Sequence, residues 1–296
     1  MIKNINKRNQ GILYIISAAF FFALMNLFVK LSGEAPLMQK CFFRNIVALF
    51  ASAFVIGKMI KNKEDIKVPK GNYKYLFIRA FSGTAGLICN FYAIDHLNIS
   101  DASMLNKLSP FFATIFSIFV LKEVANKIEW TAIILAFTGA LFVVKPSFNL
   151  DSIPACIGVL SGLGAGLAYA YVRKLSKNGV KGPVIVFAFS AFSCIICLPK
   201  IIFDYTYMSF SQIAFLILAG VAATGGQFSI TAAYSKAAAK EISVFDYTQV
   251  IFAALLGFVF LEQIPDTFSV NGYVIIIGVA IFKWLYNMKI DSKANT

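Results

Sequence analysis

Apolar runs of about twenty residues recur along this chain, and each is long enough to cross the hydrocarbon core of a bilayer as a helix. Ten runs have this length and few charges: 11–31, 37–57, 73–94, 102–121, 128–144, 153–173, 184–203, 211–234, 242–261 and 270–288. They are solid apolar blocks without the alternation that outer-membrane barrel strands require. Because 59% of the residues are hydrophobic, one water-soluble core could not hide them. The sequence predicts an all-α integral membrane protein with ten transmembrane helices.

Lysine and arginine residues are concentrated in alternate joins between these predicted helices. If the N-terminus is cytoplasmic, 20 of the 27 fall on the cytoplasmic side and five on the other, while Arg44 and Arg79 lie inside helices. The positive-inside rule therefore predicts that both termini are cytoplasmic. Since the net charge of +13 resides at helix ends, no contiguous basic surface remains for nucleic acid. We expect the lipid bilayer and a small molecule as partners, and no nucleic acid.

An internal repeat divides the chain into residues 1–148 and 149–296, with five predicted helices in each half. The matches join residues 30–32 to 174–176 at an offset of 144, and pair Asp101, Ser103 and Asn106 with Glu241, Ser243 and Asp246 at an offset of 140. Chance similarity among apolar helices is the alternative, and the matched polar identities favour a repeat. Because five is odd, the second half must cross the membrane in the opposite sense. Such inverted repeats are typical of secondary transporters.

The ten segments and the repeat, with "SPFFATIFSIFVLKE" (Pro110, Glu123) and "VIFAALLGFVFLEQ" (Glu262), resemble the EamA-like ten-helix branch of the drug/metabolite transporter superfamily. The resemblance covers nearly the whole length, and its motifs are specific for fold and poor for substrate. It implies a central cavity lined by the first, third, fourth, sixth, eighth and ninth helices. The fifth and tenth helices would lie outside as packing or dimer surfaces, in a monomer or a homodimer. Val250 occupies the position that matches Pro110, so the ninth helix lacks the proline that favours a break in the fourth.

Polar residues interrupt the fourth predicted helix at Asn106, Lys107 and Ser109, immediately around Pro110. A lysine this near a helix end could simply snorkel to the interface. Alternatively, Pro110 frees backbone carbonyls that need a protein or water-filled space, and the polar cluster faces a hydrated cavity. The neighbours of Lys107 favour the second interpretation, because snorkelling explains the lysine alone.

The ninth predicted helix carries a matching polar step at Asp246, Tyr247 and Gln249. Lys107 and Asp246 would mark the outer and inner charges of one pathway, and the sequence does not determine whether they meet. Asp246 is the one carboxylate well inside an apolar run, so it is either a proton carrier or a helix-end charge.

Hydrogen-bonding side chains near the middle of other predicted spans should also face the cavity or a neighbouring helix. These candidates are Asn26, Asn90, Tyr92, Tyr169, Gln227 and Thr231. For Arg44 and Arg79 we favour a structural or gating role over contact with an anionic substrate group.

Catalytic and metal-binding motifs are absent from the sequence. His96 is the one histidine, and there is no H-E-x-x-H, G-x-S-x-G or P-loop, so we expect no enzyme activity, no cofactor, no metal and no ATP-driven pumping. One lysine and one aspartate at different depths make a poor channel filter. We expect a secondary transporter of small organic metabolites in the plasma membrane of a bacterium. The resemblance favours export of amino acids or related compounds, with uptake of a nucleoside-like or cofactor metabolite such as S-adenosylmethionine as the alternative.

Overall fold

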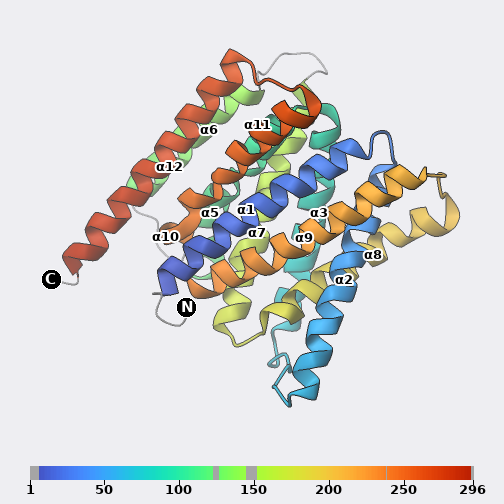
Figure 1. Ribbon diagram of the computed structural model, residues 1–296. Coiled ribbons are helices and arrows are strands. Elements are labelled where there is room, and N and C mark those ends of the chain that lie inside the picture. The colour runs from blue at the N-terminus through green and yellow to red at the C-terminus, as the bar shows by residue number, and fades with distance from the viewer. Residues whose placement is uncertain (1–6, 123–126, 145–151, 238, 295–296) are drawn as a thin grey trace.

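The computed structural model describes residues 7–122, 127–144, 152–237 and 239–294, which form helices joined by short turns (Figure 1). The helices are α1 (Lys7–Leu31), α2 (Leu37–Lys61), α3 (Tyr73–His96), α4 (Ile99–Asn106), α5 (Ser109–Val120), α6 (Lys127–Val144), α7 (Ile153–Lys177), α8 (Gly182–Phe203), α9 (Phe210–Lys236), α10 (Ala239–Asp246), α11 (Thr248–Leu261) and α12 (Thr267–Ala294). Each predicted segment corresponds to one helix or, for the fourth and the ninth, to two consecutive helices. The prediction of an all-α membrane protein is confirmed.

Nine spans in the described ranges have the length and apolar composition of a transmembrane helix. In two of them the span includes a break, between α4 and α5 and between α10 and α11. The fifth predicted segment, α6, has a shorter apolar stretch, Trp130–Val143. The chain is therefore a multi-pass membrane protein whose spans follow the hydropathy of its sequence.

Helix ends follow local sequence signals. Gly33 and Gly179 have positive φ angles of 64° and 84° directly after α1 and α7, a conformation that favours glycine because it has no Cβ. Ser209 and Gln212 form a capping box at the start of α9, where each side chain satisfies a backbone N–H of the first turn.

Helices of the two halves pair across the bundle. α1 packs along α9 and α3 along α7, while α2 packs against α8 at one edge and α6 against α12 at the other (Figure 1). The first helices of the two halves are α1 and α7, and the third helices are α3 and α9. When each is replaced by its counterpart, the α1–α9 contact becomes the α7–α3 contact. This pairing is what two five-helix halves related by a twofold axis would produce. The boundary between residues 148 and 149 stays a prediction.

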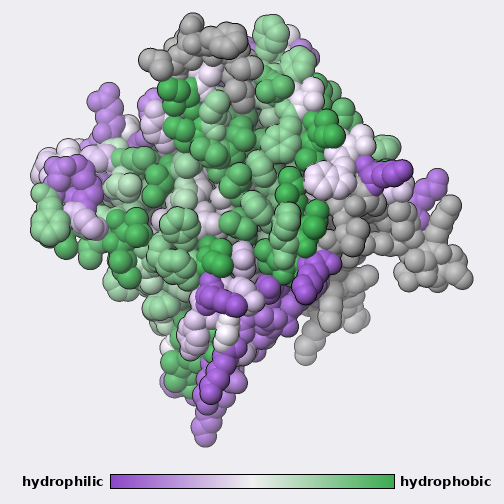
Figure 2. All heavy atoms as spheres, turned by 180° about the vertical axis from the view of Figure 1, so that it is seen from behind, coloured by the Kyte–Doolittle hydropathy of each residue, from purple (hydrophilic) through white to green (hydrophobic). Residues whose placement is uncertain are grey.

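The outer surface of the bundle is broadly apolar. Figure 2 shows hydrophobic residues over most of one face, with hydrophilic residues gathered below, where the join between α2 and α3 lies. Phe50, Phe119 and Phe258 are exposed large hydrophobic side chains on α2, α5 and α11. In water such a surface would aggregate, whereas lipid tails solvate it.

Two lysine-bearing joins, 62–72 and 178–181, lie at the same end of the bundle, because Asn178 Nδ2 donates to Asn72 Oδ1 over 2.7 Å. We call this the lysine-rich end and expect it to be cytoplasmic. In a background lacking the five native cysteines, Lys63→Cys and Lys181→Cys should react with an impermeant maleimide from the cytoplasmic side. Tyr207→Cys, in the join between α8 and α9, is the control and should react from the opposite side. Labelling of the first two from different sides would contradict the inverted repeat.

Candidate functional site

The fourth predicted span is interrupted at Lys107 and Leu108, between α4 and α5. Pro110 is the second residue of α5 and lacks the N–H that a continuous helix would need there. The chain does not unwind. Instead, the Lys107 N–H donates to the carbonyls of Ser103 and Met104 over 3.0 Å each, and the Leu108 N–H donates to Leu105 over 3.2 Å. The interruption is thus a tight 3₁₀-like turn, where an open hydrated segment was expected.

The carbonyls at this interruption lie against α7. A Cβ added to Gly162 would lie 2.8 Å from the Leu105 oxygen and 3.2 Å from the Asn106 oxygen, and one added to Gly166 would lie 2.7 Å from the Ser109 oxygen. Backbone therefore meets backbone along this glycine face, as small residues permit in membranes.

A second interruption occurs at Tyr247, although no proline is present there. The Tyr247 N–H donates to Val244 over 3.3 Å, again an i→i+3 bond, and the Thr248 hydroxyl donates to the Phe245 carbonyl over 2.7 Å. Tyr247 matches Lys107 at the repeat offset of 140, so both halves break at the same position.

The two interruptions meet in a buried ion pair. Lys107 Nζ lies 2.8 Å from Asp246 Oδ1, and the two side chains are 1% and 0% exposed. The snorkelling interpretation of Lys107 is therefore wrong, and the two charges are in contact. No other group in the described ranges donates a hydrogen bond to the Asp246 carboxylate. The pair replaces hydration that both ions have lost, so removal of either partner should be costly.

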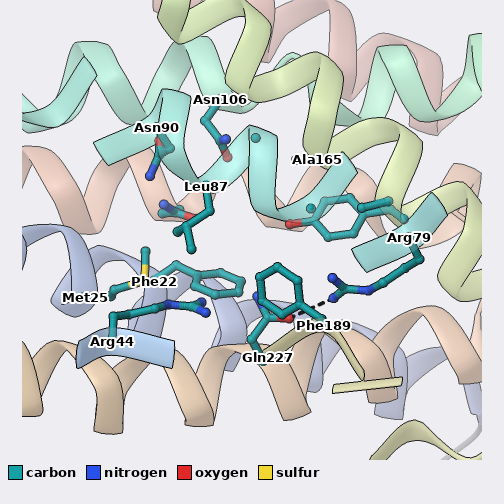
Figure 3. Close-up of a pocket in the computed structure, with 15 residues that line it drawn as sticks. Phe22, Met25, Arg44, Arg79, Leu87, Asn90, Asn106, Ala165, Phe189 and Gln227 are labelled. Carbon is teal, nitrogen blue, oxygen red and sulfur yellow. Dashed lines mark hydrogen bonds between the residues drawn. The ribbon is translucent and has the colours of Figure 1, made fainter. Parts of the chain in front are cut away.

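A pocket next to these interruptions has about 550 Å³ of empty space, a volume that includes the open solvent at its mouth (Figure 3). It is lined by residues from α1, α2, α3, α4, α7, α8, α9 and α11. The apolar walls include Phe22, Met25, Leu87 and Phe189, and the polar lining consists of Arg44, Arg79, Asn90, Asn106, Tyr169, Gln227 and Gln249. The resemblance did not include the second and seventh predicted helices among those that line the cavity. These two helices are α2 and α8, and they contribute Arg44 and Phe189 to the lining. Both side chains are long enough to reach inward from the edge pair α2–α8.

Two guanidinium groups approach the pocket from opposite sides, with the ring of Phe189 between them (Figure 3). The guanidinium carbons of Arg44 and Arg79 lie 5.6 and 4.2 Å from the centre of that ring. Arg44 Nη1 donates to Asn45 Oδ1 over 2.6 Å, and Arg79 Nη2 donates to Gln227 Oε1 over 3.1 Å. Among the described residues, no carboxylate forms an ion pair with either arginine.

Asparagine side chains connect the pocket to neighbouring helices. Asn26 Nδ2 donates to Ser103 Oγ over 3.0 Å, and Asn90 Nδ2 lies 3.5 Å from Asn26 Oδ1. Asn106 Nδ2 donates to Ser161 Oγ over 3.0 Å. Asn90 and Asn106 line the pocket, whereas Asn26 is not part of its lining.

Several sequence candidates lie outside the lining. Tyr92 is half-buried, stacks on His96 with ring centres 4.2 Å apart and does not line this pocket. Ser109, Pro110 and Tyr247 are buried at the interruptions, and Thr231 is buried one turn beyond Gln227. Tyr169 does line the pocket, and it stacks on Tyr234 at 5.1 Å.

The EamA-like transporter family matches the chain over two stretches, residues 9–145 and 153–284. The chain belongs to this family. Within the EamA-like family, the pseudopaline exporter CntI of Pseudomonas aeruginosa is 30% identical over 275 residues, covering 92% of this chain and 95% of that protein. Solute carrier family 35 member G1 of Mus musculus is 25% identical and covers 94% of this chain and 80% of that protein.

A solved crystal structure has the same fold, with a TM-score of 0.71 over 94% of this chain and 98% of the other. Its sequence identity of 14% makes this a likeness of fold alone. The relatives agree with the transporter class of this EamA-like chain.

Sequence reasoning missed most of the apolar lining of this EamA-like pocket. Phe189 and Met25 belong to runs with many similar residues, so nothing distinguishes them before the helices are packed. Gly83 and Gly86 gave a detectable signal, because the small-residue run "SGTAG" begins three residues after Arg79.

Proposed function

We propose that this protein is an exporter of amino acids or related small metabolites, and that the pocket between its two halves is the substrate site. The single observation that carries the proposal is this pocket, which both halves line with polar side chains beside two interrupted helices. Transporters of other folds bind substrate at such interruptions, between repeats. The relative named an exporter supports the direction.

Contacts between the halves at both ends of the bundle support alternating access. At the lysine-rich end, Lys174 Nζ donates to the Val120 carbonyl over 3.0 Å, in addition to the Asn178–Asn72 bond. At the opposite end, Gln39 exchanges two hydrogen bonds with the backbone of Thr206, at 2.9 and 3.2 Å. Each set consists of few polar bonds, so one can open while the other remains closed.

Counterflow in proteoliposomes tests the proposed function. Vesicles loaded with an unlabelled candidate should accumulate the same labelled compound only when they contain the protein. The screen covers amino acids and related metabolites, each measured with and without an imposed pH gradient. Failure of every amino acid and amino acid derivative to exchange would contradict the proposal.

Gln227→Ala should lower transport about tenfold while leaving the folded yield unchanged, because it removes the amide that holds Arg79 in the pocket, and hydrogen bonds to charged groups contribute about 1.5–3 kcal/mol. The matched control is Ser235→Ala, an exposed position on the same helix. Equal transport rates in the two variants would exclude Gln227 from the site. A loss of folded protein in Gln227→Ala would show that the residue serves packing.

A further inference from the structure

The titratable lining of the pocket is unbalanced in charge. Arg44 and Arg79 contribute two positive charges, and none of the residues that line the pocket is a carboxylate. The neighbouring ion pair of Lys107 and Asp246 is neutral as a unit. A cation within a membrane-spanning bundle is costly unless it is paired or serves a ligand. The lining of this pocket therefore carries two positive charges that no lining carboxylate balances.

Unused hydrogen-bonding groups accompany this unbalanced charge. In the described part of the protein, the Nε groups of Arg44 and Arg79 have no acceptor, and the oxygens of Asn90 and Gln249 have no donor. Guanidinium groups bind carboxylates through paired N–H groups, whereas amide oxygens accept from an ammonium. The two arginines lie on opposite sides of the pocket, so a single carboxylate is poorly placed to satisfy both (Figure 3).

We propose that the substrate is an amino dicarboxylate, with one carboxylate at Arg44, the other at Arg79, and its amino group toward the oxygens of Asn90 and Gln249. This inference rests on the proposed function, since it names the substrate class of the same pocket. Phe189 separates the two guanidinium groups and holds both by cation–π contact, which presents them to the two ends of one ligand.

A purely structural role for the arginines makes the opposite stability prediction. If Arg44 and Arg79 served only packing, their replacement would lower the melting temperature of the ligand-free protein. If the two arginines instead bind anionic groups of a ligand, Arg44→Gln and Arg79→Gln remove uncompensated buried charge and raise the melting temperature of the ligand-free protein. Functional sites commonly carry such a stability cost.

Thermal unfolding of the purified full chain, at constant ionic strength, measures binding. The probes are glutamate, its monoamide glutamine, the amine-free glutarate, and longer amino dicarboxylates. We expect stabilisation by at least one amino dicarboxylate, less by glutarate and none by glutamine. In Arg44→Gln and Arg79→Gln the half-saturating concentration should rise at least tenfold. Arg79→Lys should bind better than Arg79→Gln, and Lys58→Gln, which removes an exposed cation, should behave like the wild type.

Three results would overturn the substrate class: no stabilisation by any amino dicarboxylate, stabilisation by glutamine as large as that by the best amino dicarboxylate, or unchanged binding in the Arg44→Gln, Arg79→Gln double variant. Counterflow separates this failure from that of the proposed function. If the double variant exchanged neutral amino acids at the wild-type rate, the dicarboxylate inference would be wrong, and the proposed exporter function would still hold. If the protein bound dicarboxylates but exchanged no compound, the proposed transport function would be contradicted and the inferred ligand class would still hold.

Discussion

Asp246→Asn is expected to abolish transport and to lower the yield of folded protein. The substitution leaves the Lys107 ammonium buried, 1% exposed, without the carboxylate that lies 2.8 Å away. Breaking a buried pair by removing one partner costs about 3–5 kcal/mol, a large share of the about 5–15 kcal/mol by which a typical domain is stable. Size-exclusion chromatography of the solubilised protein reports the folded yield, and counterflow reports transport.

A double variant separates the stability of the ion pair from its part in transport. Lys107→Met with Asp246→Asn removes both charges at nearly constant volume, and replacing both members of a buried pair is often neutral for stability. We expect the folded yield to recover and transport to remain low, because the pair couples the interrupted helices of the two halves. Full recovery of transport would make the pair a structural feature only.

The same variants test proton coupling. Among the described residues, Lys107 is the one partner of the Asp246 carboxylate, so a proton that neutralises this carboxylate would release the lysine and uncouple the two interruptions. If Asp246 carries the proton, wild-type exchange responds to an imposed pH gradient and that of the neutral double variant does not. Wild-type exchange that ignores the gradient would contradict the proton-carrier role.

The extent of the helices could be predicted because lipid imposes it directly: each span must be apolar over the bilayer thickness. The repeat offset predicts the second polar step, and the second interruption lies in that step at Tyr247, 140 residues after Lys107. The missing proline obscured it. The Thr248 hydroxyl donates a hydrogen bond to the Phe245 carbonyl, and this bond supports the turn although no proline is present.

The facing of individual side chains could not be predicted to the same degree. Asn90 and Tyr92 are two positions apart on α3, so they point to different sides of the helix and cannot both line one pocket. The sequence does not say which side faces inward. Packing decides this, and α7 and α8 select the Asn90 side.

The arginines illustrate a second limit of sequence reasoning. Arg44 lies on α2, a helix that packs against α8 at the edge of the bundle, yet its side chain reaches the central pocket (Figure 3). The sequence favours a structural or gating role, in which ion pairs and backbone carbonyls would anchor both arginines. What changes the interpretation is the absence of a carboxylate partner among the described residues, which only the packed arrangement reveals.

Gly166→Ala is expected to destabilise the protein strongly, because α5 leaves no room for a methyl group. The added Cβ would lie 2.6 Å from Phe112 Cβ and 2.7 Å from the Ser109 carbonyl oxygen, closer than carbon atoms approach in proteins. Since the obstacle is partly backbone, relief requires α5 to move away from α7. Overpacking costs about 1–3 kcal/mol, and we expect the upper end here.

Gly278→Ala is the matched control, because it makes the same change inside α12, where nothing lies within 4 Å of the added Cβ. Alanine favours a helix over glycine by about 1 kcal/mol, so this variant should be as stable as the wild type or more stable. Melting temperatures of the purified variants give the comparison. If Gly166→Ala and Gly278→Ala had the same melting temperature, α5 would not pack on the glycine face of α7. Gly162→Ala extends the test to the turn between α4 and α5. Its Cβ would push against the Leu105 carbonyl and so displace Lys107 from Asp246.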